Sequence, residues 1–197
     1  MTSVRFVRRN KCHCPDAALR GTRLGHDGVM DWPKVPFDQD GYIESVTSDG
    51  SCFVCELVRS DPPTHEVVFR DAHHIVFLNR YPTMPGYVLV APVEHRERVV
   101  EDFTESEYLE LQSLIWRLGR AMAEVTPTER IYLLSLGSQQ GNSHVHWHVA
   151  CLPPGVPYPD QQFAALMAED GYLDVPAAER ARFAAGVAEA MVRVGSL

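Results

Sequence analysis

The sequence contains no long apolar segment. No run approaches the roughly 20 residues that a membrane-spanning helix needs. The first 30 residues, where a secretory signal would need an apolar stretch, carry several charged side chains: Arg5, Arg8, Arg9, Lys11 and Asp16. We therefore expect a cytoplasmic protein without a membrane partner.

Positive charge is also scarce. The 197 residues include 18 Lys and Arg against 26 Asp and Glu, a formal net charge of -8. This balance argues against a protein that binds long nucleic acids by neutralising many phosphates. A small anionic ligand remains compatible with it, because a pocket can be locally positive. The sequence also lacks internal repeats and low-complexity tracts, and its length suits one domain or at most two.

Cysteine is sparse and unevenly placed. The five cysteines are an odd number, which is a poor match to a secreted disulfide framework. Cys52 and Cys55 form a C-x-x-C pair, which can bind one tetrahedral zinc or act in redox chemistry. A redox pair should open a helix within an alternating βα pattern, whereas Pro62-Pro63 and strand-like runs follow here, so we favour metal. Cys12-His13-Cys14 is a weaker second candidate for metal binding.

The chain divides into three predicted parts. Residues 1–50 lack a sustained hydrophobic period and read as an irregular extension. Residues 51–155 read as the domain that carries the site, and residues 156–197 as a helical segment that packs on it. Short runs rich in β-formers predict five strands, at 66–70, 74–79, 86–91, 130–136 and 144–151.

A helical pattern lies between the third and fourth predicted strands. Thr104 and Glu107 form a capping box. Apolar residues then recur at helical spacing until Pro127 ends the pattern. Residues 161–170 and 177–193 predict two further helices, which would cover the sheet or a neighbouring subunit. The fold class is therefore α+β: a five-stranded antiparallel sheet with a long packed helix and C-terminal helices.

Three histidines alternate along the last predicted strand. His144, His146 and His148 should share one face, about 6.6 Å apart, because alternate side chains of a strand point the same way. The intervening positions hold large apolar residues, Val145, Trp147 and Val149. Such a row suits catalytic zinc, or a neutral imidazole that attacks phosphorus. The pattern alone does not choose between them.

This stretch resembles the hallmark of the histidine triad (HIT) superfamily, in which three histidines alternate with apolar residues. The match spans His144 to Ala150, and residues 76–82 and 85–92 resemble the upstream strand, turn and strand of the family. Asp102-Phe103-Thr104 stands where the family begins its long helix. The resemblance covers about residues 51–155, and residues 161–173 resemble the C-terminal helix of bacterial members.

The resemblance implies a nucleotide hydrolase or transferase that works through a nucleotidyl-histidine intermediate. His146 would attack the α-phosphorus, while His148 and His144 would complete the catalytic triad, with His148 assisting charge or leaving-group protonation. Asn79 would lie near the nucleoside. The polar loop before the triad would donate hydrogen bonds to phosphate oxygens, through Gln139, Gln140, Asn142 and Ser143.

One branch of the superfamily carries a structural zinc, and its ligand positions correspond to Cys52, Cys55, His95 and His144. Many members form homodimers through the helix and an edge strand, so a homodimer is also expected from the resemblance. Two sequence features indicate which branch of the superfamily the chain resembles. Tyr87 stands where many members have histidine. His148 is present where the uridylyltransferase branch has glutamine, which favours a hydrolase.

Three alternatives to the hydrolase stay open. Phosphate or another acceptor in place of water would make the protein a phosphorylase or a nucleotidyltransferase. A nucleotide-binding regulatory module with little turnover would use the same pocket. A metal-dependent hydrolase would use zinc to activate water.

Overall fold

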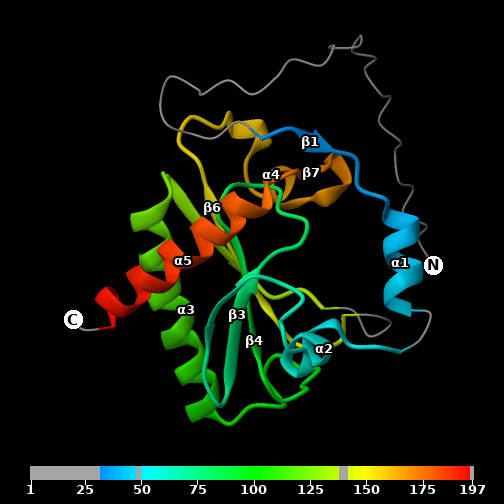
Figure 1. Cartoon of the computed structure of the whole chain (residues 1–197), viewed down its shortest axis with the longest axis vertical. Helices are drawn as coiled ribbons and strands as arrows, with labels where there is room; N and C mark the ends of the chain where they lie inside the picture. The colour runs from blue at the N-terminus through cyan, green and yellow to red at the C-terminus, as the bar shows by residue number, and fades with distance from the viewer. Residues whose placement is uncertain (1–31, 48–49, 138–141, 196–197) are drawn as a thin grey trace, which may run out of the picture.

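The computed structural model describes residues 32–47, 50–137 and 142–195 (Figure 1). The predicted metal fragment at Cys12-His13-Cys14 and the loop residues Gln139 and Gln140 lie outside these ranges. Within them, every helix is too short or too polar to cross a membrane.

The centre of the fold is a five-stranded antiparallel sheet with the order β2-β3-β4-β6-β5. Its strands are β2 (Val67–Arg70), β3 (His74–Leu78), β4 (Tyr87–Pro92), β5 (Arg130–Leu134) and β6 (Trp147–Leu152). The predicted α+β class and the five-stranded antiparallel sheet are confirmed. The last strand begins three residues later than predicted, because the Val145 N–H donates to the carbonyl of Arg96 (2.7 Å) instead of to a neighbouring strand.

Side chains alternate between two apolar layers on the two faces of this sheet. Val88 and Val90 of β4 pack in one layer with the long helix, whereas Leu89 and Ala91 pack in the other layer with the short helix that follows Cys52. The predicted alternation in the last strand holds: residues 145, 147 and 149 are buried on the long-helix side. His146 and His148 therefore lie on the opposite side of the sheet.

Helix α3 (Glu105–Val125) covers the first face as predicted. Its start is fixed by the capping box, in which the Thr104 hydroxyl accepts from the Glu107 N–H and the Glu107 carboxylate accepts from the Thr104 N–H. The helix ends at Val125, two residues before Pro127, a residue that cannot supply a helical N–H.

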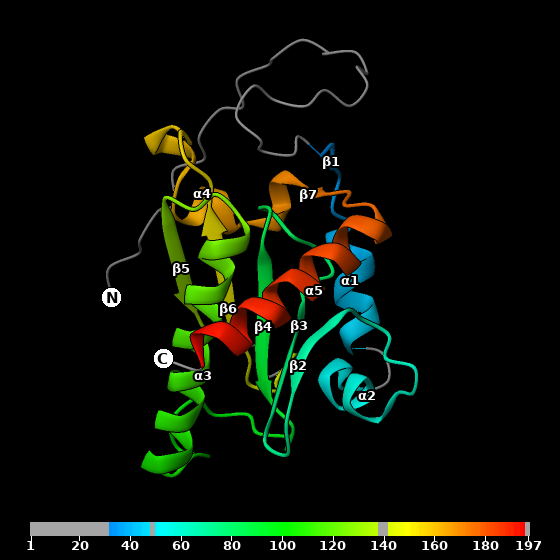
Figure 2. The ribbon, with the colours of Figure 1, turned by 60° about the vertical axis from the view of Figure 1, so that its left-hand side comes forward.

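The C-terminal helix α5 (Ala177–Val194) lies beside α3 on the same face (Figure 2). This prediction is confirmed, but the single helix predicted for residues 161–170 is wrong. That segment forms two short pieces, α4 (Phe163–Leu166) and η2 (Ala168–Asp170), and a third, η1 (Tyr158–Asp160), precedes it. Gln162 has a left-handed backbone (φ 56°) and its N–H donates to the hydroxyl of Tyr132 (3.0 Å), so the chain turns where a continuous helix would have to pass.

The expected N-terminal extension includes regular structure that the sequence reading missed. It contributes β1 (Lys34–Val35) and α1 (Gln39–Thr47), and α2 (Phe53–Arg59) follows it. Strand β1 pairs with β7 (Tyr172–Leu173) near the other end of the chain. Gly171 (φ 95°) makes this pairing possible, since a Cβ there would lie 2.7 Å from the Val35 carbonyl oxygen.

An aromatic cluster fastens this N-terminal segment, residues 34–47, to the main body. Phe37 and Tyr42 each pack edge-on against Tyr81, with ring centroids 5.1 and 5.8 Å apart, and Tyr172 packs against Phe37 and Tyr81. These partners are distant in sequence, so no local period marks the segment. It therefore folds by packing rather than by intrinsic helix propensity.

The first turn of α3 should make stability depend on pH. Hydrogen bonds from Arg96 and then from the Thr104 N–H hold the pKa of Glu107 at about 2, below its ordinary value of 4.5. The folded state thus gains stability from Glu107 above pH 4.5, and loses it as the pH falls towards 2. Urea unfolding should show Glu107→Gln less stable than the parent protein at pH 7, with the difference shrinking towards pH 3.

Glu105→Gln is the matched control, because it makes the same change in the same turn without touching the Arg96 contact. Its deficit should be smaller and vary less with pH. An unchanged Glu107→Gln deficit between pH 7 and pH 3 would contradict this account of the capping box.

Candidate functional site

A cavity of about 480 Å³ lies on the face of the sheet opposite α3 and α5. Its floor is made by side chains from β3, β4, β6 and β5, and its walls come from α1, α2 and α4. Strand register sets the floor: Phe77 pairs with Leu89, Leu89 with His148, and His148 with Leu134. The cavity size is within the usual range for small-molecule sites.

His146 lines this cavity and has a defined neutral form. Its Nδ1 lies 2.8 Å from the carbonyl oxygen of His144, so Nδ1 carries the proton and donates. Burial lowers the pKa of His146. The ring is therefore neutral at pH 7, and Nε2 holds a free lone pair. Phe53 packs edge-on against the ring at 5.6 Å between centroids, which fixes its orientation.

His148 lies beside His146, with 4.9 Å between the ring centroids. Its Nδ1 is 3.0 Å from the hydroxyl of Tyr87. Burial, with a smaller effect of His146, lowers the pKa of His148 to about 3, and burial raises the pKa of Tyr87 to about 12. Both groups stay neutral near pH 7, and the contact fits a Tyr87 hydroxyl that donates to Nδ1, an arrangement that places the proton of His148 on Nε2. Tyr87 thus provides the third histidine with a direct hydrogen-bond partner.

His144 turns away from the other two imidazoles. It is fully buried, its Nε2 donates to the carbonyl of Pro92 (3.0 Å), and its Nδ1 lies 3.3 Å from Sγ of Cys52 and 3.6 Å from Sγ of Cys55. The expected row of three imidazoles on one face is therefore divided: His146 and His148 line the cavity, and His144 joins a neighbouring cluster.

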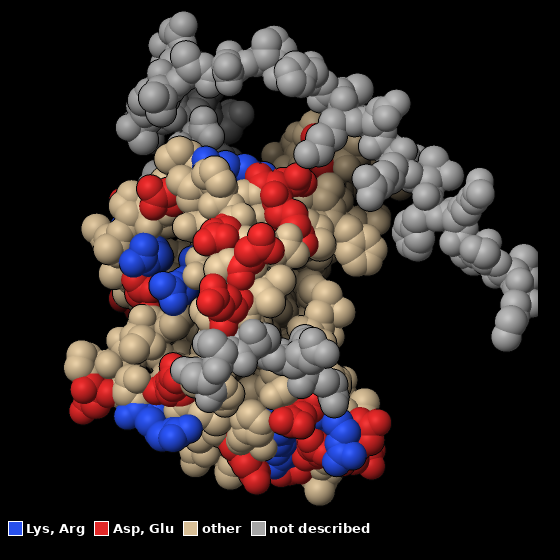
Figure 3. All heavy atoms as spheres, turned by 90° about the vertical axis from the view of Figure 1, so that its right-hand side faces the viewer, with Lys and Arg blue, Asp and Glu red and all other residues tan. Residues whose placement is uncertain are grey.

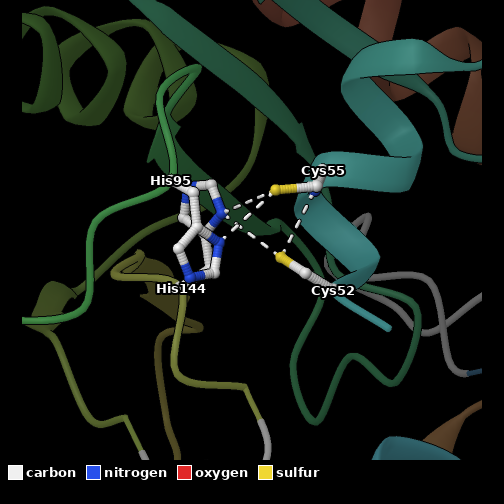
Figure 4. A group of neighbouring side chains, drawn as sticks. All are labelled: Cys52, Cys55, His95 and His144. Carbon is white, nitrogen blue, oxygen red and sulfur yellow. Dashed lines mark hydrogen bonds between the residues drawn. The ribbon is translucent and has the colours of Figure 1, made fainter. Parts of the chain in front are cut away.

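The cluster brings together the four predicted metal ligands, Cys52, Cys55, His95 and His144 (Figure 4). Their ligand atoms lie within 4.8 Å of one another, and Sγ of Cys55 is 3.4 Å from Nδ1 of His95. Tetrahedral zinc with ordinary Zn–S and Zn–N lengths separates S from N by about 3.6 Å. Three S–N distances in the cluster, 3.3, 3.4 and 3.6 Å, are close to that value.

The outer contacts of the cluster also suit a metal. Nε2 of His144 is bound to a backbone carbonyl, and Nε2 of His95 lies 3.3 Å from a carboxylate oxygen of Glu97. These contacts put the protons on Nε2 and leave both Nδ1 lone pairs facing the thiols, the usual arrangement for histidine ligands. The cysteine pair does open a helix, contrary to the sequence reading: Cys52 caps α2 by accepting from the Cys55 N–H. A missing helix therefore no longer argues against redox chemistry. The preference for a metal site depends instead on the imidazoles of His95 and His144 beside the two thiols.

The three predicted nucleotide-binding residues that the structure describes differ in their positions and contacts. Asn79 lines the cavity, and its Oδ1 accepts from the Tyr81 N–H (3.0 Å), which leaves the amide NH₂ available. Asn142 also lines the cavity, but its amide donates to the hydroxyl of Tyr42 on α1. Ser143 is not among the cavity-lining residues.

Several cavity residues were missed by sequence reasoning. Some come from the N-terminal segment and α2, and others from β5 and α4. Their sequence signals were those of packing or of irregular chain, so only the fold assembles them: Tyr42, Phe53, His65, Leu134, Phe163 and Met167.

Comparisons with known proteins agree with this geometry. Residues 62–153 match the family model described as the HIT domain. A HIT-like protein of Mycoplasma genitalium is 27% identical over 107 residues, which are 52% of this chain and 72% of that protein.

Solved structures share the fold. A histidine triad nucleotide-binding protein from Sulfolobus tokodaii superposes with a TM-score of 0.59 at 18% identity, over 73% of this chain and 93% of that one. A zinc-bound histidine triad protein from Mycobacterium smegmatis superposes with a TM-score of 0.58 at 20% identity, over 75% and 97% of the two chains. At these identities the likeness establishes the fold alone.

Proposed function

The chain contains a HIT domain and belongs to the histidine triad family, and from this premise we propose that it is a nucleotidyl hydrolase. The substrate is a nucleoside phosphate derivative, either a dinucleoside polyphosphate or a nucleoside phosphoramidate. The observation that carries the proposal is the hydrogen bond from Nδ1 of His146 to the carbonyl of His144, because it leaves Nε2 as a nucleophile in a cavity of suitable size.

The reaction proceeds in two displacements at the α-phosphorus. In the first, the Nε2 lone pair of His146 forms a bond to phosphorus, and the bond from phosphorus to the leaving group breaks. The leaving group keeps the electron pair and takes up a proton from solvent, which the water of the second displacement returns. In the second, a water oxygen attacks the phosphorus, loses a proton, and displaces His146 to give a nucleoside monophosphate.

Neutral donors stabilise the phosphate in this scheme. The hydroxyl of Tyr87 holds Nδ1 of His148, so that Nε2–H of His148 is free to donate to a phosphate oxygen. Asn79 lines the cavity, and its amide NH₂ would bind the nucleoside. By resemblance, Asn142, Ser143, Gln139 and Gln140 supply further donors. Phosphoryl transfer depends mainly on positioning and charge stabilisation, which such donors provide.

Replacement of the nucleophile tests this function. His146→Asn should lower kcat/KM by on the order of 10³ or more, while the affinity for a nucleoside monophosphate changes only a few-fold. Mass spectrometry of the parent protein quenched during turnover should detect one nucleotidyl group on His146.

His73→Asn is the matched control, since it makes the same change at an exposed histidine outside the cavity. Full activity of His146→Asn would overturn the proposal. Binding without any turnover by the parent protein would favour the regulatory module, and release of a nucleoside diphosphate in phosphate buffer would identify a phosphorylase.

We further propose that Cys52, Cys55, His95 and His144 hold a structural zinc. Four protein ligands close the coordination shell, so the ion would supply cross-linking rather than a bound water. It would join α2, the loop after β4 and the chain that leads to His146.

Metal analysis tests the zinc site. The purified protein should contain one zinc per chain, and Cys55→Ser should lose most of it. Removal should destabilise the protein by about 3 kcal/mol or more, on the order of 10 °C in Tm. Cys151→Ser is the control, because Cys151 is a buried thiol outside the cluster. Loss of turnover on chelation with an unchanged Tm would contradict the structural assignment and favour zinc-activated water.

We also propose a homodimer formed through α3 and the edge strand β5. Leu109 and Trp116 of α3 and Leu133 of β5 are between 55 and 60% exposed. Large apolar side chains exposed on one helix and an adjacent sheet edge are typical of an interface.

Sedimentation velocity tests the dimer. The parent protein should sediment as a dimer at micromolar concentration, and Trp116→Lys should sediment as a monomer because a charge would be buried at the interface. Val100→Lys, at another exposed apolar residue, should remain dimeric. A monomeric parent protein would contradict this proposal.

A further inference from the structure

The cavity has two chemically different halves, on either side of the two histidines. In the sheet order, β6 carries His148 and begins directly after His146, with β4 and β3 to one side and β5 to the other. The cavity floor therefore continues from His148 to Leu89 and Phe77 in one direction, and to Leu134 in the other. A substrate that reacts at His146 must extend into both halves.

The half over β3 and β4 provides hydrogen-bonding groups and aromatic rings. Asn79 and His65 line it, with Phe53 and Phe77 beside them, and the His65 ring packs edge-on against Phe77 at 5.8 Å. These groups suit a nucleoside, whose sugar needs hydrogen bonds and whose base packs on aromatic rings.

The half over β5 is lined by apolar side chains. Leu134 pairs with His148, and α4 closes this side above it. Phe163 of α4 is 73% exposed although it lines a cavity. The members of this half are Leu134, Leu136, Phe163, Leu166 and Met167. Apolar side chains left in contact with water around a cavity are typical of a surface that an apolar ligand covers.

Contacts with β5 and with the apolar layer of the sheet hold helix α4 in place. The N–H of Gln162, the residue before it, donates to the hydroxyl of Tyr132 on β5 (3.0 Å), and Leu166 packs against the apolar layer on this face of the sheet. The apolar half is therefore a formed surface of the fold.

Charge in the cavity does not suit a polyphosphate leaving group. Across the described lining, Arg80 is the one guanidinium, Glu56 balances it, and the β5 half contains neither. Acidic side chains also gather over the middle of the face that carries α1 (Figure 3). Asp38, Asp40 and Glu44 are exposed there. Neutral donors can hold a single phosphate, whereas a polyphosphate leaving group adds several charges, and these surroundings add no cation to neutralise them.

We infer that the leaving group is uncharged and apolar, so that the substrate is a nucleoside 5′-monophosphate joined to an aromatic or aliphatic group rather than a dinucleoside polyphosphate. This inference rests on the proposed nucleotidyl hydrolase. The β5 half, with α4, selects the group that departs when His146 takes the nucleotidyl moiety.

Matched phosphoramidates of adenosine 5′-monophosphate test the inference. The phenethylamine, methylamine and taurine amides share the same P–N bond and differ in the tail, which is aromatic, small or anionic. The parent protein should prefer the phenethyl tail over the methyl and taurine tails by about tenfold to a hundredfold in kcat/KM, the effect expected for burying one phenyl group. Phe163→Ser should lose most of that preference.

Tyr158→Ser is the control, because Tyr158 is an exposed aromatic residue in the same segment but outside the cavity, and it should keep the preference. Equal rates for the three tails, or faster cleavage of diadenosine tetraphosphate, would overturn the inference while leaving the hydrolase in place. Affinities of the three amides for His146→Asn provide a second measurement that needs no turnover. If the parent protein cleaves neither the three amides nor diadenosine tetraphosphate, the hydrolase proposal fails. The tail preference in binding then still decides the inference.

Discussion

The candidate site depends on His144, whose main-chain carbonyl and side chain have different partners. The carbonyl of His144 accepts the Nδ1 proton of His146, while the side chain of His144 lies among the cysteines and His95. The main-chain position that orients the His146 ring is thus held by a cluster outside the cavity. A shift of this peptide would change the hydrogen bond at Nδ1, and with it the nitrogen on which the lone pair of His146 resides. The structure of the Cys/His cluster therefore affects the orientation and the tautomer of His146 in the cavity.

The sheet, the long helix and the main chemical residues could be predicted because each depends on local pattern. Alternation of apolar residues defines the strands, and the capping box with its helical period defines α3. The resemblance of the chain to a known family then identified Cys52, Cys55, His95 and His144 as a group, although the cysteine pair lies 40 or more residues from either histidine. Spacing alone could not have done so, because nothing local links the pair of cysteines to either histidine.

The cavity walls could not be predicted, because long-range packing forms them. Helix α1 is held by aromatic rings from distant parts of the chain and by the pairing of β1 with β7. The segment around α4 has helix-forming residues, yet the contact between Gln162 and Tyr132 overrides this preference. The division of the triad was likewise hidden in the sequence, since strict alternation predicted three rings on one face. The chain becomes regular strand only at Trp147.

The pairing of β1 with β7 joins the two ends of the described chain around the cavity. A fragment trimmed to the 92 residues between positions 62 and 153 would keep both cavity histidines. It would lack the cysteine pair, α1 and α4, and so would expose the floor of the sheet to solvent. The cavity is therefore built from more of the chain than the stretch that matches the HIT domain.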